Sequence, residues 1–114
     1  MAGRADELAQ AIADRLVAMG PVRARAMFSG HGLFLDDVMF GLIVRGTLYF
    51  KVGETNRGDY DEARSKPFSY VRGTRRIAMS YMTVPDAALG DGAVLAAWGE
   101  RALTVARTAK KKKR

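Results

Sequence analysis

The chain contains no cysteine and only one histidine, His31. Without cysteine there is no disulfide framework, no zinc ribbon and no thiol nucleophile. A single histidine excludes a histidine-rich metal site and limits a Ser-His-Asp relay to His31. We therefore predict no catalytic residue, no metal and no cofactor, and we keep an enzyme centred on His31 as an alternative.

Long hydrophobic runs are also missing. The longest apolar segment, Val38–Val44, is interrupted by Gly41 and falls far short of the ~20 residues that a membrane span needs. Residues 1–14 mix charged side chains with alanines and so lack the apolar region of a secretory signal. We expect a cytoplasmic protein with no membrane partner.

Charge is uneven along the chain, with 19 Lys and Arg against 12 Asp and Glu and a net charge of +7. The last five residues are all basic, and without them 14 basic residues remain against the 12 acidic ones. We predict a disordered basic tail, which is either only solvated or makes non-specific contact with nucleic acid. Its residues are Lys110, Lys111, Lys112, Lys113 and Arg114.

The length of 114 residues suits a single domain, which we place at residues 1–109. Apolar residues at helical spacing predict a first helix that ends at Gly20 and Pro21. This stripe consists of Ala5, Leu8, Ile12, Leu16 and Met19.

Alternating and short apolar runs predict antiparallel strands after that helix. We expect three strands between Arg23 and Val52, with the first interrupted by Ser29–Gly32 and turns at Asp36-Asp37 and Arg45-Gly46. A short helix capped by Asn56 follows, then a hairpin over residues 68–81, and then a helix that Asp91 caps and that ends near Thr108. The predicted fold is α+β: helix, three antiparallel strands, helix, two strands, helix.

Several strings of residues resemble the N-terminal domain of the TfoX/Sxy competence regulators. They are Arg25–Phe34 (RAMFSGHGLF), Val38–Ile43 (VMFGLI), Lys66–Tyr70 (KPFSY) and Met79–Tyr81 (MSY), with Pro85, Leu95 and Trp98 after them. The likeness covers residues 16–102. Ser29 and Asp37 stand where family members usually have glycine, and both lie at predicted turns.

The resemblance implies a curved antiparallel sheet similar in outline to secretion-chaperone-like domains, which commonly dimerise. It also implies a role in regulating DNA uptake and transformation genes. Full-length regulators of this family carry a second, helical domain, and we expect this chain to be the N-terminal domain alone.

The Gly30-His31-Gly32 segment has two readings. Two glycines beside a histidine are able to bring backbone N–H groups close to an anion, or they form a β-bulge or sharp bend. Asp36 and Asp37 are the nearest carboxylates along the chain, and we interpret them as turn formers.

Aromatic and basic residues interleave on the predicted strands, with Phe28, Tyr49, Tyr70 and Tyr81 near Arg25, Lys51 and Arg72. Such a pattern either stacks nucleobases or packs across strands. Methionines in the strands favour core filling or a compliant partner groove, and we expect Met82 to be exposed. The candidate binding residues are Arg25, His31, Tyr70, Arg72, Arg75, Arg76, Tyr81 and Met82.

The sequence thus predicts a non-enzymatic interaction module that forms a homodimer and contacts a protein of the transcription apparatus. The alternative is a nucleic-acid accessory protein that uses the basic tail together with Arg72, Arg75 and Arg76.

Overall fold

A computed structural model of the chain describes residues 4–27 and 30–112, and it confirms the α+β class. One antiparallel sheet has the strand order β1-β2-β3-β4-β6-β5. Its strands are β1 (Arg23–Met27), β2 (Gly30–Leu35), β3 (Val38–Val44), β4 (Thr47–Lys51), β5 (Pro67–Arg72) and β6 (Arg75–Thr83). The helices are α1 (Arg4–Arg15), the 3-10 turn η1 (Val17–Met19), α2 (Arg57–Glu62), α3 (Asp86–Leu89) and α4 (Gly92–Lys112).

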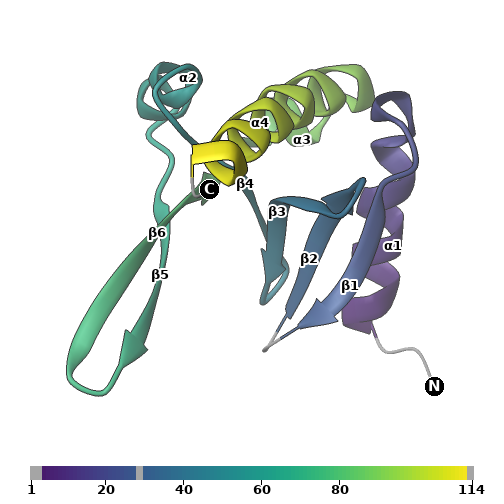
Figure 1. The fold of residues 1–114 in the computed structure, drawn as a ribbon. Helices are drawn as coiled ribbons and strands as arrows, with labels where there is room; N and C mark the ends of the chain where they lie inside the picture. Colours follow the sequence, from purple (N-terminus) through teal and green to yellow (C-terminus); the bar gives the residue numbers. More distant parts are fainter. Residues whose placement is uncertain (1–3, 28–29, 113–114) are drawn as a thin grey trace.

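The helices pack around one side of the sheet, and the β5–β6 hairpin projects away from β1–β3 (Figure 1). A single hydrophobic core joins α1 and α4 to the strands. Its largest fully buried side chains are Phe40, Phe50, Tyr60, Leu16, Leu33 and Leu95.

The buried side of α1 differs from the predicted apolar stripe in the first half of the helix, where Ala9 is buried in place of Leu8. Ala9, Ile12 and Ala13 are buried, whereas Leu8 is 37% exposed. The helix also stops at Arg15, and η1 continues the turn to Met19 before Gly20 adopts a φ of 126°. Only glycine takes that conformation readily, which explains the predicted end of the helical region.

The segment from Arg23 to Leu35 is not one interrupted strand but two paired strands. β1 and β2 are antiparallel neighbours with Met27 opposite Gly30, so the sheet has one more strand than predicted. A bulge is present, but it falls between Leu33 and Phe34 and not at the glycines. Phe28 and Ser29 lie outside the described residues.

The two predicted tight turns are confirmed. Asp36 and Asp37 have φ values of 51° and 64°, and Arg45 and Gly46 have values of 52° and 80°. Positive φ at both central residues is the mark of the type I′ turn, whose twist matches that of the flanking strands. These turns create the β2–β3 and β3–β4 hairpins.

Helix α2 is short, as predicted, but Asn56 does not cap it through its side chain. The Asn56 carboxamide instead accepts a hydrogen bond from the Gly53 N–H (2.8 Å) and donates one to the Lys51 carbonyl (3.0 Å). Asn56 is 2% exposed, so these bonds satisfy a buried polar group at the end of β4.

Helix α4 begins as predicted, because the Asp91 carboxylate accepts hydrogen bonds from the N–H groups of Ala93 and Val94. It continues to Lys112, beyond the expected end near Thr108. Residues 110–112 are therefore helical where a disordered tail was predicted. The cations of Lys110 and Lys111 are electrostatically favourable in the last turn of a helix. Lys113 and Arg114 lie outside the described residues. Within the described chain, no helix is both long and apolar enough to cross a membrane.

Candidate interaction surface

The sheet has a face that packs on the helices and a second face, which we call the open face. Side chains alternate between the two faces along each strand, and residues paired across an antiparallel ladder share a face. The pairing of Phe50 with Gly41 and Met82 marks the helix side, and that of Tyr49 with Leu42 marks the open face. The open face carries Met27, Phe34, Met39, Leu42, Val44, Tyr49, Phe68, Tyr70, Met79 and Tyr81.

The open face contains an apolar cavity of about 330 Å³. It spans both ends of the sheet, because β1–β3 supply one wall and the β5–β6 hairpin supplies the other. Its lining residues are Met27, Gly30, His31, Met39, Leu42, Val44, Phe68, Tyr70 and Met79. Leu42 and Tyr81 are buried on this face without belonging to the hydrophobic core.

Gly32 makes room for two of the methionines. A Cβ atom at this position would lie 2.6 Å from the Met27 sulfur, 2.9 Å from the Met39 sulfur and 2.8 Å from the Phe34 ring. The two thioethers therefore converge directly above the Gly32 backbone. Met side chains are flexible and polarisable, which suits them to contact partners of varied shape.

Gly30 allows the backbones of two strands to lie close together. A Cβ atom there would lie 2.1 Å from the carbonyl oxygen of Ile43, on the neighbouring strand. Both glycines thus sit within the β2–β3 ladder, where they allow tight packing. The prediction of a β-bulge at Gly30 and Gly32 is therefore wrong, because the register shift lies between Leu33 and Phe34.

Aromatic rings form a row from β4 to β5 on the open face. The Tyr49 and Phe68 rings meet edge to face with their centroids 5.2 Å apart, and the Phe68 and Tyr70 centroids are 6.4 Å apart. Tyr49 and Phe68 therefore pack against each other across strands, which is one of the two predicted alternatives. Tyr70 ends the row and remains 41% exposed.

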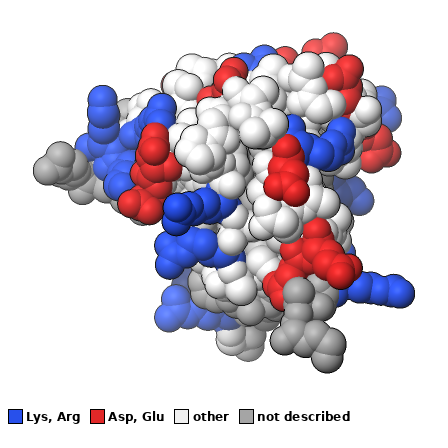
Figure 2. Space-filling view, turned by 90° about the vertical axis from the view of Figure 1, so that its right-hand side faces the viewer, with Lys and Arg blue, Asp and Glu red and all other residues white. Residues whose placement is uncertain are grey.

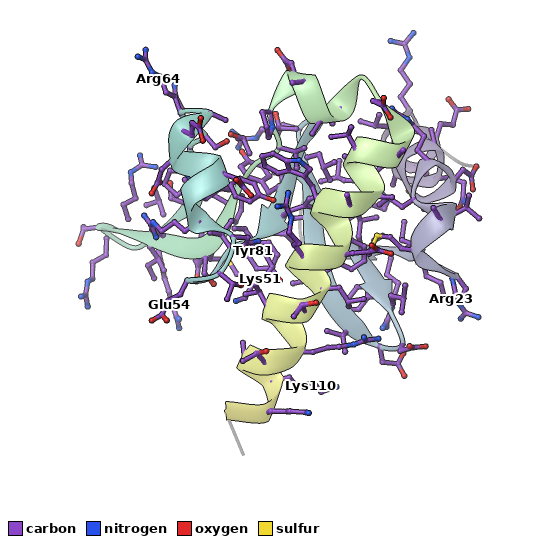
Figure 3. The ribbon with its side chains drawn as sticks, turned by 90° about the horizontal axis from the view of Figure 1, so that it is seen from above. Arg23, Lys51, Glu54, Arg64, Tyr81 and Lys110 are labelled. Atoms are coloured by element: carbon purple, nitrogen blue, oxygen red, sulfur yellow. The ribbon has the colours of Figure 1, made fainter. Side chains whose placement is uncertain are left out.

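Tyr81 is buried beneath the surface of the open face, because only 5% of the residue is exposed. Its hydroxyl donates a hydrogen bond to the Met39 carbonyl (3.4 Å), and burial raises the pKa of Tyr81 to about 12. The Lys51 ammonium lies 5.2 Å from the centre of the Tyr81 ring, and Figure 3 shows these two side chains next to each other.

The described strands carry no Asp or Glu, and all of their charged residues are basic. These are Arg23, Arg25, Lys51, Arg72, Arg75 and Arg76. The Arg25 guanidinium lies over the Phe34 ring at 5.2 Å. Figure 2 shows the side of the molecule that faces right in Figure 1. On that side, unlike on the strands, acidic and basic side chains lie beside one another.

The three arginines of the β5–β6 hairpin divide between the two faces. Arg72 pairs with Arg75, and both follow the alternation of Tyr70 and Ile77 onto the open face. Arg76 pairs with Val71 on the opposite face and donates a hydrogen bond to the Ser69 hydroxyl (3.1 Å). Figures 1 and 3 both place the C-terminal end of α4 away from the tip of this hairpin, so residues 110–112 and the hairpin arginines do not form one surface.

His31 has an orienting carboxylate that its sequence neighbours did not suggest. Its Nε2 lies 2.7 Å from a carboxylate oxygen of Asp6, on α1. The side chain of His31 is 9% exposed, whereas that of Asp6 is 51% exposed. Because His31 shares the helix side of the sheet with its partner Ile43, this contact fastens α1 to β2.

Met82 is buried, not exposed as predicted. It is 6% exposed and pairs with Phe50 on the helix side, so it belongs to the core. Met79, which the alternation places on the opposite side, lines the cavity. Within residues 4–27 and 30–112, no group of three His, Cys, Asp or Glu side chains is arranged to hold a metal ion.

The chain is thus an α+β domain whose sheet has one face against helices and one face with an apolar cavity. It belongs to the TfoX N-terminal domain family, whose model matches residues 14–106. The chain is similar to DNA transformation protein TfoX1 of Aliivibrio fischeri, with 32% identity over 68 residues. That match covers 60% of this chain and 32% of the relative, so the chain corresponds to about a third of that protein.

Proposed function

We propose that this chain is a regulatory domain in DNA transformation that controls competence genes through protein contacts on its open face. The family and the relative named for DNA transformation support the process. The open face supports the mode of action: apolar side chains line a cavity there, and binding sites are typically concave and mostly apolar. This cavity is the observation on which the proposal depends. We place the protein in the cytoplasm, where the transcription apparatus lies.

The experiment compares native cells with and without the gene for this chain. We expect loss of the gene to lower transformation frequency and the transcripts of DNA-uptake genes together. Unchanged transcripts and frequency would contradict the proposal. Affinity capture of the chain before and after nuclease treatment then separates the modes of action: protein contact predicts a partner that survives nuclease.

A homodimer stays part of the proposal. Among the residues that the structure describes, the outer strands β1 and β5 each have one edge without a partner strand. Such edges are covered, charged or paired in stable proteins, and a second copy is one way to pair them. Light scattering at micromolar concentration tests this point, and a monomer mass would refute it.

The alternative function is nucleic-acid binding through the basic C-terminal residues. Lys110 and Lys111 favour it, because both are exposed and add positive charge near the end of α4. It predicts salt-sensitive DNA affinity that falls strongly when residues 110–114 are deleted. Under the protein-contact proposal, the same deletion leaves transformation unchanged.

A further inference from the structure

We infer that the methionine-lined cavity binds an acidic segment of a partner protein, which inserts an apolar side chain between the two arginine-bearing hairpins. The inference rests on the proposed function, since it names the chemistry of the protein that the open face contacts. Two properties of the face lead to it: the lining of the cavity and the sign of the charge on the strands around it.

The lining selects an apolar side chain as the group that enters. The lining includes the thioethers of Met27, Met39 and Met79, the alkyl groups of Leu42 and Val44, and the rings of Phe68 and Tyr70. A Leu, Phe or Met side chain gains free energy by leaving water for such a site. A nucleobase would bury polar edges there without partners, which costs free energy.

The charge around the cavity selects an acidic partner. The chain from residue 15 to 35 and from 63 to 85 includes both hairpins that flank the cavity, and neither stretch contains Asp or Glu. Arg25 lies on one hairpin, and Arg72 and Arg75 lie at the tip of the other. Among the described residues, none of these three arginines forms an ion pair with a carboxylate.

Carboxylates also lie near the open face, because Asp6 contacts His31 of the cavity lining, and Asp36 and Asp37 line a hollow together with Arg25. Two acidic residues form ion pairs with α4. Asp36 pairs with Arg107 (3.3 Å), and Asp59 pairs with Arg101 (2.9 Å), so these carboxylates tie a turn and α2 to α4. The open face of a second copy would therefore present arginines to arginines, and opposed like charges disfavour that contact. Charge complementarity favours a partner segment rich in Asp and Glu over a second copy of this face.

The experiment selects random peptides displayed on phage against the immobilised full chain, and repeats the selection on two variants. Met79→Asp places a charge in the cavity, and Val71→Asp places the same charge on the other face of the hairpin, where Val71 is 61% exposed. Tyr70→Asp serves as a second cavity variant if Met79→Asp does not fold, because Tyr70 is already 41% exposed.

We expect the enriched peptides to have Asp or Glu on both sides of a large apolar residue. The synthetic peptide of the most enriched sequence should bind the Met79→Asp variant at least about tenfold more weakly, and the Val71→Asp variant with unchanged affinity. Replacing its acidic residues with lysine, or its apolar residue with serine, should each weaken binding by about tenfold or more.

The inference is wrong if no peptide is enriched, if the enriched peptides show no acidic excess, or if Met79→Asp binds them equally well. It is also wrong if a labelled single-stranded oligonucleotide binds the open face and competes with every selected peptide. The proposed function fails separately, when Met79→Asp leaves transformation at the level of Val71→Asp. If transformation falls with Met79→Asp and the peptides show no acidic excess, the open face is the functional surface and only the chemistry of the partner is wrong.

Discussion

Replacing Gly32 with alanine adds one methyl group at the floor of the methionine cavity. The new Cβ would lie 2.6 Å from the Met27 sulfur and 2.9 Å from the Met39 sulfur. It would also lie 2.8 Å from the Phe34 ring. All three contacts are with side chains, so the two methionines and the ring shift while the backbone stays in place. Overpacking of this kind costs about 1–3 kcal/mol of the free energy of unfolding. Alanine also lowers the conformational entropy of the unfolded chain, which offsets about 0.4–1 kcal/mol of that loss.

Alanine substitutions at two other glycines, Gly30 and Gly58, provide the comparison for the stability of the Gly32 variant. At Gly30 the new Cβ would lie 2.1 Å from the Ile43 carbonyl oxygen, so the ladder between β2 and β3 has to open. We expect a loss of about 4 kcal/mol or more there, since backbone must shift. At Gly58, in α2, nothing lies within 4 Å of the new Cβ. Alanine is the better helix former, and we expect a gain of about 0.5–1 kcal/mol.

Urea unfolding measures all three variants through the fluorescence of Trp98, the only tryptophan of the chain. Its ring packs against Tyr60 with the centroids 4.8 Å apart, so the signal reports on the core. The expected order of stability is the Gly58 variant, the wild type, the Gly32 variant and then the Gly30 variant. Equal losses at Gly30 and Gly32 would refute the distinction between a backbone contact and a side-chain contact.

Three further perturbations test other contacts. Tyr60→Phe removes a buried hydroxyl that has no hydrogen-bond partner among the described residues, and should raise the free energy of unfolding by about 1 kcal/mol in urea titrations. The folded protein keeps the Tyr81 proton up to pH about 12, whereas the unfolded chain loses it near 10. The contribution of Tyr81 is therefore complete below about pH 10 and lost as pH rises to about 12, a fall of about 2–3 kcal/mol that Tyr81→Phe should remove from alkaline unfolding curves. Asp6→Asn and His31→Ala, measured singly and together, should show a coupling energy of about 0.5–3 kcal/mol, and additive losses would contradict the contact.

The hairpins after Val38 could be predicted because their signals are local. Alternation along residues 47–51 places Leu48 and Phe50 on one side and Tyr49 and Lys51 on the other, and the turn residues determine the register. The reversal between β1 and β2 could not be predicted in this way. Glycines in this pattern indicate a β-bulge or a sharp bend, whereas close packing within the ladder is what requires Gly30 and Gly32.

The functional face was only partly visible in the sequence. Alternation along β6 places Met79 and Met82 on opposite sides, but it does not indicate which side the helices cover. Burial of Met82 follows from its place beside Phe50 in the core, which is a property of the whole fold. The contact of His31 with Asp6 joins residues 25 positions apart on different elements, so no local pattern could have indicated it.

Two neighbouring residues of β5 allow the most direct test of the open face as the functional surface. Tyr70 lies on the open face and Val71 on the opposite face, and both are exposed enough to accept aspartate without unfolding. Transformation frequency is measured in native cells whose only copy of the gene encodes Tyr70→Asp or Val71→Asp, at matched protein levels. We expect Tyr70→Asp to behave like loss of the gene and Val71→Asp to behave like the wild type. Equal frequencies for the two variants, or the reverse order, would contradict the assignment of function to this face.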